Sequence, residues 1–241
     1  ISLVNIDLEV RSGEVVGIAG VAGNGQDELL KALNGEKTCR RASCVIIENQ
    51  HAGNLGPNAR RRVGLASVPE KRLGHGAIPD MDLADNAFMT GFYRMGLLAK
   101  GLINYPKTRN FAHKVITDFS VKTPGFSVPA NSLSGGNLQK FIIGRELTQQ
   151  PEILIVSQPT WGVDAGAAQT IRQALRDLAA KGSAVLIISQ DLDELMEMTD
   201  RIGAICGGRL SHFYPTMDMT VEKVGLLMAG VSLEEGETNA A

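Results

Sequence analysis

A glycine-rich turn at residues 20–27, GVAGNGQD, has the residue types that point most directly to chemistry. It follows the apolar run Val15–Ala19 and precedes residues 27–33, whose leucines share one helical face. Glycines let successive backbone N–H groups turn inward, and the start of a helix adds positive potential. The turn therefore has the features of a phosphate-binding loop, although any tight strand-to-helix connection also uses glycine.

The end of this turn lacks two groups that a nucleotide site needs. The turn resembles the P-loop pattern G-x-x-x-x-G-K-[ST], which Gly20 and Gly25 match. Gln26 stands where a lysine would reach the β- and γ-phosphates, and Asp27 stands where Ser or Thr would ligate Mg²⁺. One misplaced unit charge at about 4 Å costs roughly 4 kcal/mol at an effective dielectric of 20. We therefore expect Mg-ATP to bind weakly or without hydrolysis here, with Mg²⁺ absent or weakly held.

A second helix start, in the segment LSGGNLQK, also has an anion-binding pattern. Ser134 followed by Gly135 and Gly136 places a hydroxyl and free backbone N–H groups at the beginning of a helix. A serine N-cap alone would produce the same pattern. The segment resembles the ABC signature motif, which in that family crosses a dimer interface and holds the γ-phosphate bound on the partner. The residues that match this motif are Leu133, Ser134, Gly135, Gly136, Asn137 and Gln139.

The apolar run ILIV followed by SQPT resembles a Walker B strand whose two acids are replaced. Ser157 stands for the Asp that orients the Mg²⁺ shell, and Gln158 stands for the Glu that polarises the attacking water. Gln190 replaces the histidine of the switch segment, while Asp164 matches the D-loop aspartate. Glu70 stands where many ABC domains carry the Q-loop glutamine. We call the nucleotide site formed by this chain's own P-loop the home site. We therefore expect no catalytic residue at the home site.

These motifs occur in the ABC order over residues 1 to about 230. The whole pattern is similar to the C-terminal ABC half of the double-domain ATPases that serve sugar and nucleoside importers. The segments GNGQ, SQPT and VKTPG favour the nucleoside-uptake branch. Trp161 departs from the family, which usually has arginine at this position. The candidate nucleotide-binding residues at the home site are Gly20, Gly23, Asn24, Gly25, Gln26, Asp27 and Glu70.

The resemblance implies a domain that no longer hydrolyses ATP at its own site and lends its signature motif to a second ABC domain. It implies as partners an N-terminal ABC domain of the same polypeptide, transmembrane permease subunits and, indirectly, a solute-binding protein. The expected location is the cytoplasmic face of the plasma membrane. Two alternatives remain: an active ATPase of a sugar importer, with Asp27 holding Mg²⁺, and an ABC protein acting in translation or repair.

The elements expected to position these residues form an α/β fold of the P-loop NTPase type, with a parallel-sheet core, a helical insert and flanking β hairpins. Residues 1–73 and 151–231 are expected to form the core, residues 74–150 the insert, and residues 232–241 a disordered tail. Helical pattern dominates residues 82–146, with loops expected at Tyr105-Pro106 and residues 123–125. The segments expected to be strands are Val15–Ala19, Ala184–Ser189 and residues 3–10, 43–48, 63–68, 153–156, 202–206 and 209–213.

Composition narrows the function classes further. Of the 241 residues, 44% are hydrophobic and 21% charged, and the net charge is −2, which argues against nucleic acid as a partner. No apolar run approaches the ~18–20 residues needed to cross a bilayer, so a membrane link must run through another protein. The three cysteines, Cys39, Cys44 and Cys206, are expected to be reduced thiols.

The insert offers a candidate surface for the permease. Together with residues 69–72, it is expected to receive a cytoplasmic permease helix. Packing within the insert is an equally good explanation for each of its candidate contact residues. These candidates are Phe88, Met89, Phe92, Tyr93 and Met95.

Overall fold

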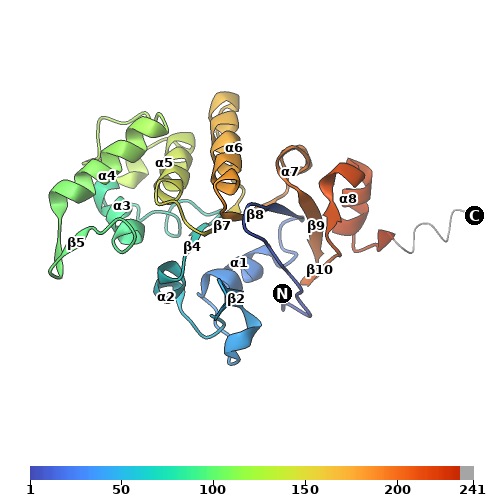
Figure 1. Ribbon diagram of the computed structural model, residues 1–241. Coiled ribbons are helices and arrows are strands. Elements are labelled where there is room, and N and C mark those ends of the chain that lie inside the picture. Colours follow the sequence, from blue (N-terminus) through green and yellow to red (C-terminus); the bar gives the residue numbers. More distant parts are fainter. Residues whose placement is uncertain (234–241) are drawn as a thin grey trace, which may run out of the picture.

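The computed structural model describes residues 1–233 and consists of a mostly parallel sheet with helices on both faces (Figure 1). The strand order is β10-β9-β1-β8-β7-β4. β10 pairs with the end of β9, and β11 pairs with its beginning. The strands of this sheet are β1 (Val15–Ala19), β4 (Leu65–Val68), β7 (Ile153–Ser157), β8 (Ala184–Ser189), β9 (Arg201–Cys206), β10 (Arg209–Leu210) and β11 (Tyr214–Pro215). The α/β fold expected from the sequence is confirmed, and β10 and β11 are its antiparallel additions.

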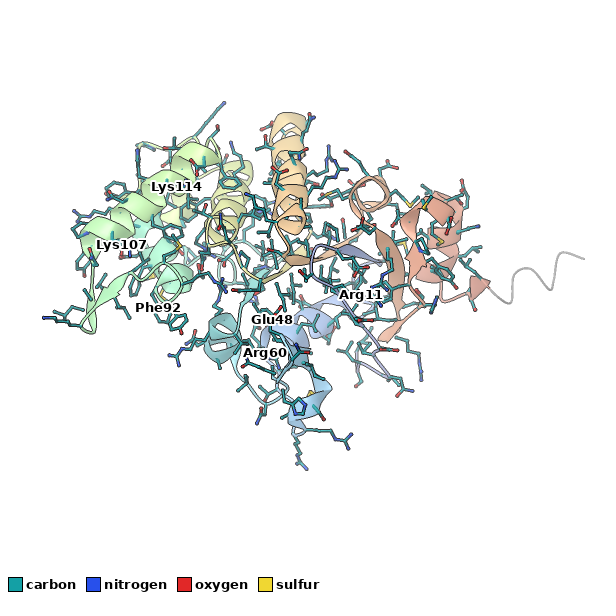
Figure 2. The ribbon with its side chains drawn as sticks, in the orientation of Figure 1. Arg11, Glu48, Arg60, Phe92, Lys107 and Lys114 are labelled. Atoms are coloured by element: carbon teal, nitrogen blue, oxygen red, sulfur yellow. A yellow bond between two sulfur atoms is a disulfide. The ribbon has the colours of Figure 1, made fainter. Side chains whose placement is uncertain are left out.

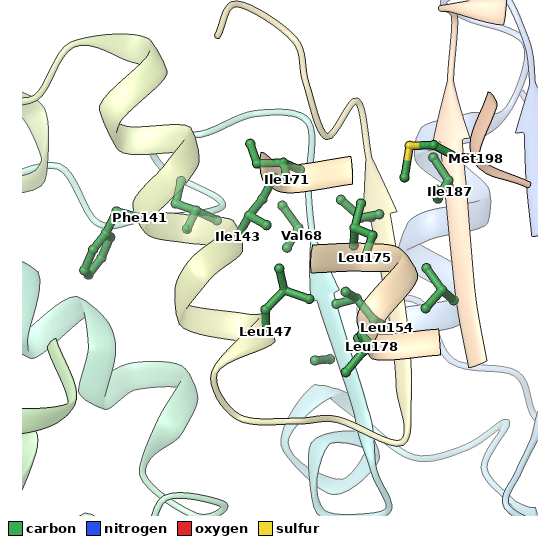
Figure 3. Packing of buried hydrophobic residues seen from close by; sticks show 14 of the residues in the cluster. Val68, Phe141, Ile143, Leu147, Leu154, Ile171, Leu175, Leu178, Ile187 and Met198 are labelled. Carbon is green, nitrogen blue, oxygen red and sulfur yellow. The ribbon is translucent and has the colours of Figure 1, made fainter. Parts of the chain in front are cut away.

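Alternate side chains of the central strands enter two different cores. Val185 and Ile187 of β8 face one cluster, whereas Leu186 and Ile188 face the other. This alternation follows from the period of two in a strand, and it explains why the buried strands read as continuous apolar runs. In Figure 3, Ile171, Leu175 and Leu178 of one covering helix pack toward Leu154 of β7.

Helices cover both faces of the sheet and gather at one end of it. In Figure 1, α6 and α7 lie above the sheet, α1 and α2 lie below it, and α3, α4 and α5 lie together at the β4 end. The helices are α1 (Gln26–Asn34), α2 (Pro57–Arg62), α3 (Leu83–Gly91), α4 (Tyr105–Asp118), α5 (Gly135–Leu147), α6 (Ala165–Ala180), α7 (Leu192–Met198) and α8 (Val221–Met228). The division into a core and an insert at residues 74–150 stays a prediction.

Short elements complete the chain. Arg60 of α2 is fully buried and donates to the carbonyl oxygens of Ala52 and Leu55, which fixes the loop between α1 and α2 (Figure 2). Two small hairpins and three 3-10 turns occupy the remaining connections. They are β2 (Ile46–Ile47) with β3 (Gln50–His51), β5 (Leu98–Ala99) with β6 (Leu102–Ile103), and the turns Ala42–Cys44, Ala130–Ser132 and Thr216–Asp218.

Several expectations about local structure are wrong. Residues 3–10 partly cover alternate side chains but form no strand, because Asn5 has a φ of 49° and interrupts the extended backbone. The strand expected at residues 43–48 is reduced to Ile46–Ile47. Tyr105-Pro106 begins α4 instead of breaking it, since proline suits the first turn of a helix, where no N–H donor is needed. The second strand expected at residues 209–213 ends at Leu210.

The expectation of reduced thiols is also wrong for two of the cysteines. Cys39 and Cys44 form a disulfide, because the loop between them turns back and brings their Cα atoms to 6.7 Å. Cys206 is a free thiol. Within residues 1–233, no helix has the length and apolar character to cross a bilayer. The predicted tail lies outside the described residues, apart from Ser232 and Leu233.

Candidate functional site

The predicted site residues meet at one edge of the sheet. β1, β8, β7 and β4 are parallel neighbours, so their carboxyl ends share that edge, where ligands of open α/β sheets bind. The glycine-rich turn follows β1, and Ser157 and Ser189 end β7 and β8. The topology therefore brings together the segments that resemble the P-loop, Walker B and switch motifs.

A cavity of about 940 Å³ opens at this edge. Sequence reasoning missed some of the residues that line it, including Lys71, Arg72, Leu73, Trp161 and Ser189. The predicted site residues that line it are Gly20, Gly23, Gln26, Asp27, Glu70, Leu133, Gly135, Ser157, Gln158 and Gln190. The predicted site residues outside its lining are Asn24, Gly25, Ser134, Gly136, Asn137, Gln139 and Asp164.

The side chain of Gln26 folds back into the phosphate loop. Its Nε2 donates to the carbonyl oxygen of Val21 at 2.7 Å, and its Oε1 accepts from the backbone N–H of Asn24 at 3.1 Å. A β-carbon at Gly20 would lie 2.6 Å from Gln26 Nε2 and 2.7 Å from the Cγ2 of Ile205, so a larger residue there would require these side chains to move. The amide of Gln26 therefore already holds a backbone N–H group that a phosphate would need.

Asp27 is exposed on the first turn of α1, where it lines the cavity. Its carboxylate is 70% exposed and accepts from Nζ of Lys31 at 3.0 Å. This hydrogen bond raises the pKa of Lys31. The contact offsets part of the negative charge expected at the loop and directs the carboxylate toward a cation of its own helix.

The ends of β7 and β8 are uncharged where they meet. Gln158 is 6% exposed, and its Oε1 lies 3.4 Å from the Ser189 hydroxyl and 3.5 Å from the Gln190 N–H. Its φ of 51° turns the chain sharply after β7. No carboxylate stands at Ser157, Gln158 or Gln190 to orient a metal shell or accept a proton from water.

A carboxyl group lies behind this edge. The hydroxyl of Ser189 donates to Oε2 of Glu194 at 2.9 Å, whereas Oε1 of Glu194 has no hydrogen-bond partner within residues 1–233. Burial raises the pKa of Glu194, and the hydrogen bond from Ser189 opposes this only in part. Glu194 does not line the cavity, so it is not placed to act on a nucleotide there.

The residues at the home site do not fit a magnesium ion. Asp27 pairs with Lys31, and the end of β7 supplies only a hydroxyl and an amide. Within residues 1–233, no three His, Cys, Asp or Glu side chains are grouped as metal ligands.

The turn before α5 is open to solvent. Ser134 and Gly135 are exposed, and Ser134 Oγ accepts from the Asn137 side-chain amide at 2.9 Å. Asn137 Oδ1 in turn accepts from the Lys122 N–H, which fixes the turn from the side. The first N–H groups of a 13-residue helix therefore point into an accessible space, which gives an anion-binding end.

Asp164 has a local structural role beside the site. It caps α6 by accepting from the Ala167 N–H at 2.9 Å, and this hydrogen bond lowers the pKa of Asp164. Its side chain lines a smaller, separate cavity with Lys140. The D-loop segment thus lies next to the signature turn, where a β-carbon at Gly136 would be 3.3 Å from the Gly162 carbonyl oxygen.

Comparisons with known proteins identify sequences similar to this chain. Residues 3–161 match the family model described as "ABC transporter". The guanosine import ATP-binding protein NupO of Bacillus subtilis is 36% identical over 236 residues, covering 98% of this chain and 46% of NupO. The nucleoside import ATP-binding protein NupA of Lactococcus lactis is 37% identical over 230 residues, covering 95% of this chain and 45% of NupA. The chain therefore spans about half the length of these relatives.

A solved structure shares the fold. The dimeric ATP-binding cassette MJ0796, in a post-hydrolysis state with ADP and phosphate, has a TM-score of 0.75 and 22% sequence identity. The match covers 89% of this chain and 90% of that cassette.

Proposed function

We propose that this chain, which belongs to the ABC transporter family of ATP-binding domains, is the non-hydrolytic partner in a pair of ABC domains that drives an importer. One contrast carries the proposal. The home site has an amide filling its phosphate loop and no carboxylate at the end of β7, whereas the signature turn is complete and exposed. The domain then contributes to turnover at a site whose P-loop belongs to its partner.

The chemistry missing from the home site supports the first half of this proposal. Phosphoryl transfer needs a cation over the terminal phosphate and a group that positions the attacking water. Gln26 and Gln158 supply neither, and Asp27 is engaged by Lys31 instead of facing a metal. The ion pair between Asp27 and Lys31 argues against the alternative of an active ATPase that holds Mg²⁺ there.

The intact signature turn supports the second half. Ser134 Oγ and the N–H groups at the start of α5 are arranged to donate to a phosphate oxygen, and the helix dipole favours negative charge at the same place. In the pair, these groups stabilise charge on the terminal phosphate of ATP bound to the other domain. They move no proton, so their contribution is electrostatic.

The relatives support the cargo and the partners. Those reported above are named for guanosine and nucleoside import, and this chain corresponds to about half of each. We infer that the paired domain lies in the same polypeptide, N-terminal to this one, and that nucleosides are the cargo. Permease subunits hold the pair at the cytoplasmic face of the membrane, and a solute-binding protein acts through the permease.

The test measures ATP hydrolysis by the complete pair of domains. Ser134→Arg places a bulky cation at the signature turn and is expected to lower turnover about 100-fold. Ser132→Arg, at an exposed serine two positions earlier, is the matched control and should leave turnover unchanged. Gln158→Ala at the home site should also leave it unchanged. Mg-dependent hydrolysis that persists in Ser134→Arg and disappears in Gln158→Ala would contradict the proposal.

A further inference from the structure

Arg72 joins three segments that are distant in the sequence. Its Nε donates to Oε1 of Gln139 at 2.9 Å, and its Nη2 donates to the backbone carbonyl oxygen of Trp161. Gln139, which is 1% exposed, donates onward to the carbonyl oxygen of Pro159 at 3.0 Å. The segment after β4, the signature helix α5 and the loop after β7 are therefore connected through one side chain.

The guanidinium lies against the backbone of both loops. A β-carbon at Gly135 would stand 2.7 Å from Arg72 Nη1, and one at Gly162 would stand 3.0 Å from Nη2. Gly135 is the first residue of α5 and directly follows Ser134 of the signature turn. The guanidinium of Arg72 therefore lies close to the start of α5 and to the loop after β7.

Ordinary stabilisation explains this arrangement poorly. Burial lowers the pKa of Arg72, and within residues 1–233 the hydrogen bonds of its guanidinium go to a side-chain amide oxygen and a backbone carbonyl oxygen. Removing a cation from water costs free energy, and uncharged acceptors repay that cost only in part. The contacts of Arg72 are therefore poorly explained as a contribution to the stability of the fold. Its planar fork instead satisfies acceptors on two different elements in one fixed geometry, which a lysine cannot do.

We propose that Arg72 is a positioning residue that fixes the signature turn against the loop after β7, and so sets the geometry in which this domain meets its partner's nucleotide. This inference rests on the proposed function. The backbone beneath Arg72 is itself anchored, because its carbonyl oxygen accepts from the Ala77 N–H at 2.7 Å. A shift of the turn by about 1 Å would reduce transition-state stabilisation far more than binding of ATP.

The experiment uses the complete pair of domains and compares Arg72→Lys and Arg72→Met with wild type. Arg72→Lys keeps the charge but not the fork, so both variants are expected to lower kcat about 10- to 100-fold with little change in KM for ATP. Arg109→Met, at an exposed arginine of α4 without a hydrogen bond or ion pair among residues 1–233, is the matched control. Full activity of Arg72→Lys would overturn the proposal, because charge alone would then suffice.

A second measurement separates this inference from the proposed function. Hydrogen–deuterium exchange in the same assembly should rise at residues 133–140 and 158–164 in Arg72→Met, and nowhere else to the same extent. Unchanged exchange would overturn the positioning role, even where Ser134→Arg abolishes turnover. Raised exchange combined with full turnover in Ser134→Arg would instead leave the positioning role standing and contradict signature donation.

Discussion

The Gln26 side chain uses both ends of its amide inside the loop that precedes α1. A lysine at this position would offer a charge to a phosphate, whereas the amide holds the Asn24 N–H and the Val21 carbonyl oxygen. A phosphate entering the loop must first displace that amide and then meets no cation in its place. The loop is therefore closed by its own side chain as well as lacking the lysine charge.

Removing the Gln26 amide should raise the affinity of the loop for ATP slightly, and restoring a lysine at this position should raise it further. We expect Gln26→Ala to bind ATP more tightly than wild type, and the double variant Gln26→Lys with Asp27→Thr to gain at least about tenfold over Gln26→Ala. Titration calorimetry with ATP and magnesium measures both affinities. Gln169→Ala, an exposed glutamine on α6, is the control. Equal affinities in wild type and Gln26→Ala would show that the amide does not close the loop.

Local sequence indicated these residues because the motifs are contiguous. The pattern around Gly20 and Gly25 predicted a phosphate-binding loop, and Ser157 and Gln158 were predicted to stand where related motifs carry acids. The role of Arg72 was not predictable, since its partners Gln139 and Trp161 lie 67 and 89 positions away. Nor does sequence show that Gln26 folds into the loop and that Asp27 pairs with Lys31, because both depend on rotamers chosen in the folded loop.

At the level of helices and strands, the pattern of apolar residues along the sequence determined what could be predicted. The continuous apolar runs at β1, β7 and β8 indicated buried parallel strands, and all are present. The predictions of short segments were wrong because their structure depends on the conformation of one or a few residues. Asn5 breaks the expected first strand by its positive φ, and the disulfide between Cys39 and Cys44 depends on a loop turn that spacing does not reveal.

A buried ionic cluster ties α5 to the elements around it. Glu146 accepts from Arg61 of α2 at 2.8 Å and from Arg145 at 2.9 Å. Arg145 also donates to the carbonyl oxygens of Asn86 on α3 and of Gly76. Glu146 is fully buried, so its charge is stable only with both arginines present. The orientation of α5, and thus of the signature turn at its start, depends on this cluster.

Neutralising Glu146 should destabilise the fold strongly. Glu146→Gln leaves two arginines without a counter-charge, and we expect a loss of about 3–5 kcal/mol in the free energy of unfolding, measured by urea denaturation. Glu48→Gln, at an exposed glutamate without an ion pair among the described residues, is the control (Figure 2). A loss no larger than that of the control would contradict a structural role for the cluster.

The carboxylate of Glu146 should make the free energy of unfolding depend on pH. Burial alone would raise the pKa of Glu146, but the charges of Arg61 and Arg145 outweigh it and hold the pKa below its ordinary value. The stabilisation is therefore complete above the ordinary glutamate pKa and is lost as the pH falls through the lowered value. The stability gap between wild type and Glu146→Gln should narrow over that acidic range, whereas a gap independent of pH would contradict the ionic explanation.

On the surface of the whole molecule near α3, some of the candidate permease-contact residues pack against the core, whereas others are exposed to solvent. Phe88, Phe92 and Met95 pack against the large core cluster, which supports their internal role. Met89 and Tyr93 are 47% and 58% exposed, and the guanidinium of Arg62 lies 5.6 Å from the centre of the Tyr93 ring. The candidate permease contact of the proposed importer therefore narrows to Met89 and Tyr93.

A charge at this contact should separate the domain from the permease without unfolding it. We expect Met89→Glu to reduce copurification of the complete transporter at least about tenfold, because a carboxylate buried at an interface is costly, while the melting temperature stays near that of wild type. Met217→Glu is the matched control, since Met217 is 91% exposed and lies before α8, in another part of the fold (Figure 1). Equal recovery of the two variants would place the permease contact elsewhere on the molecule.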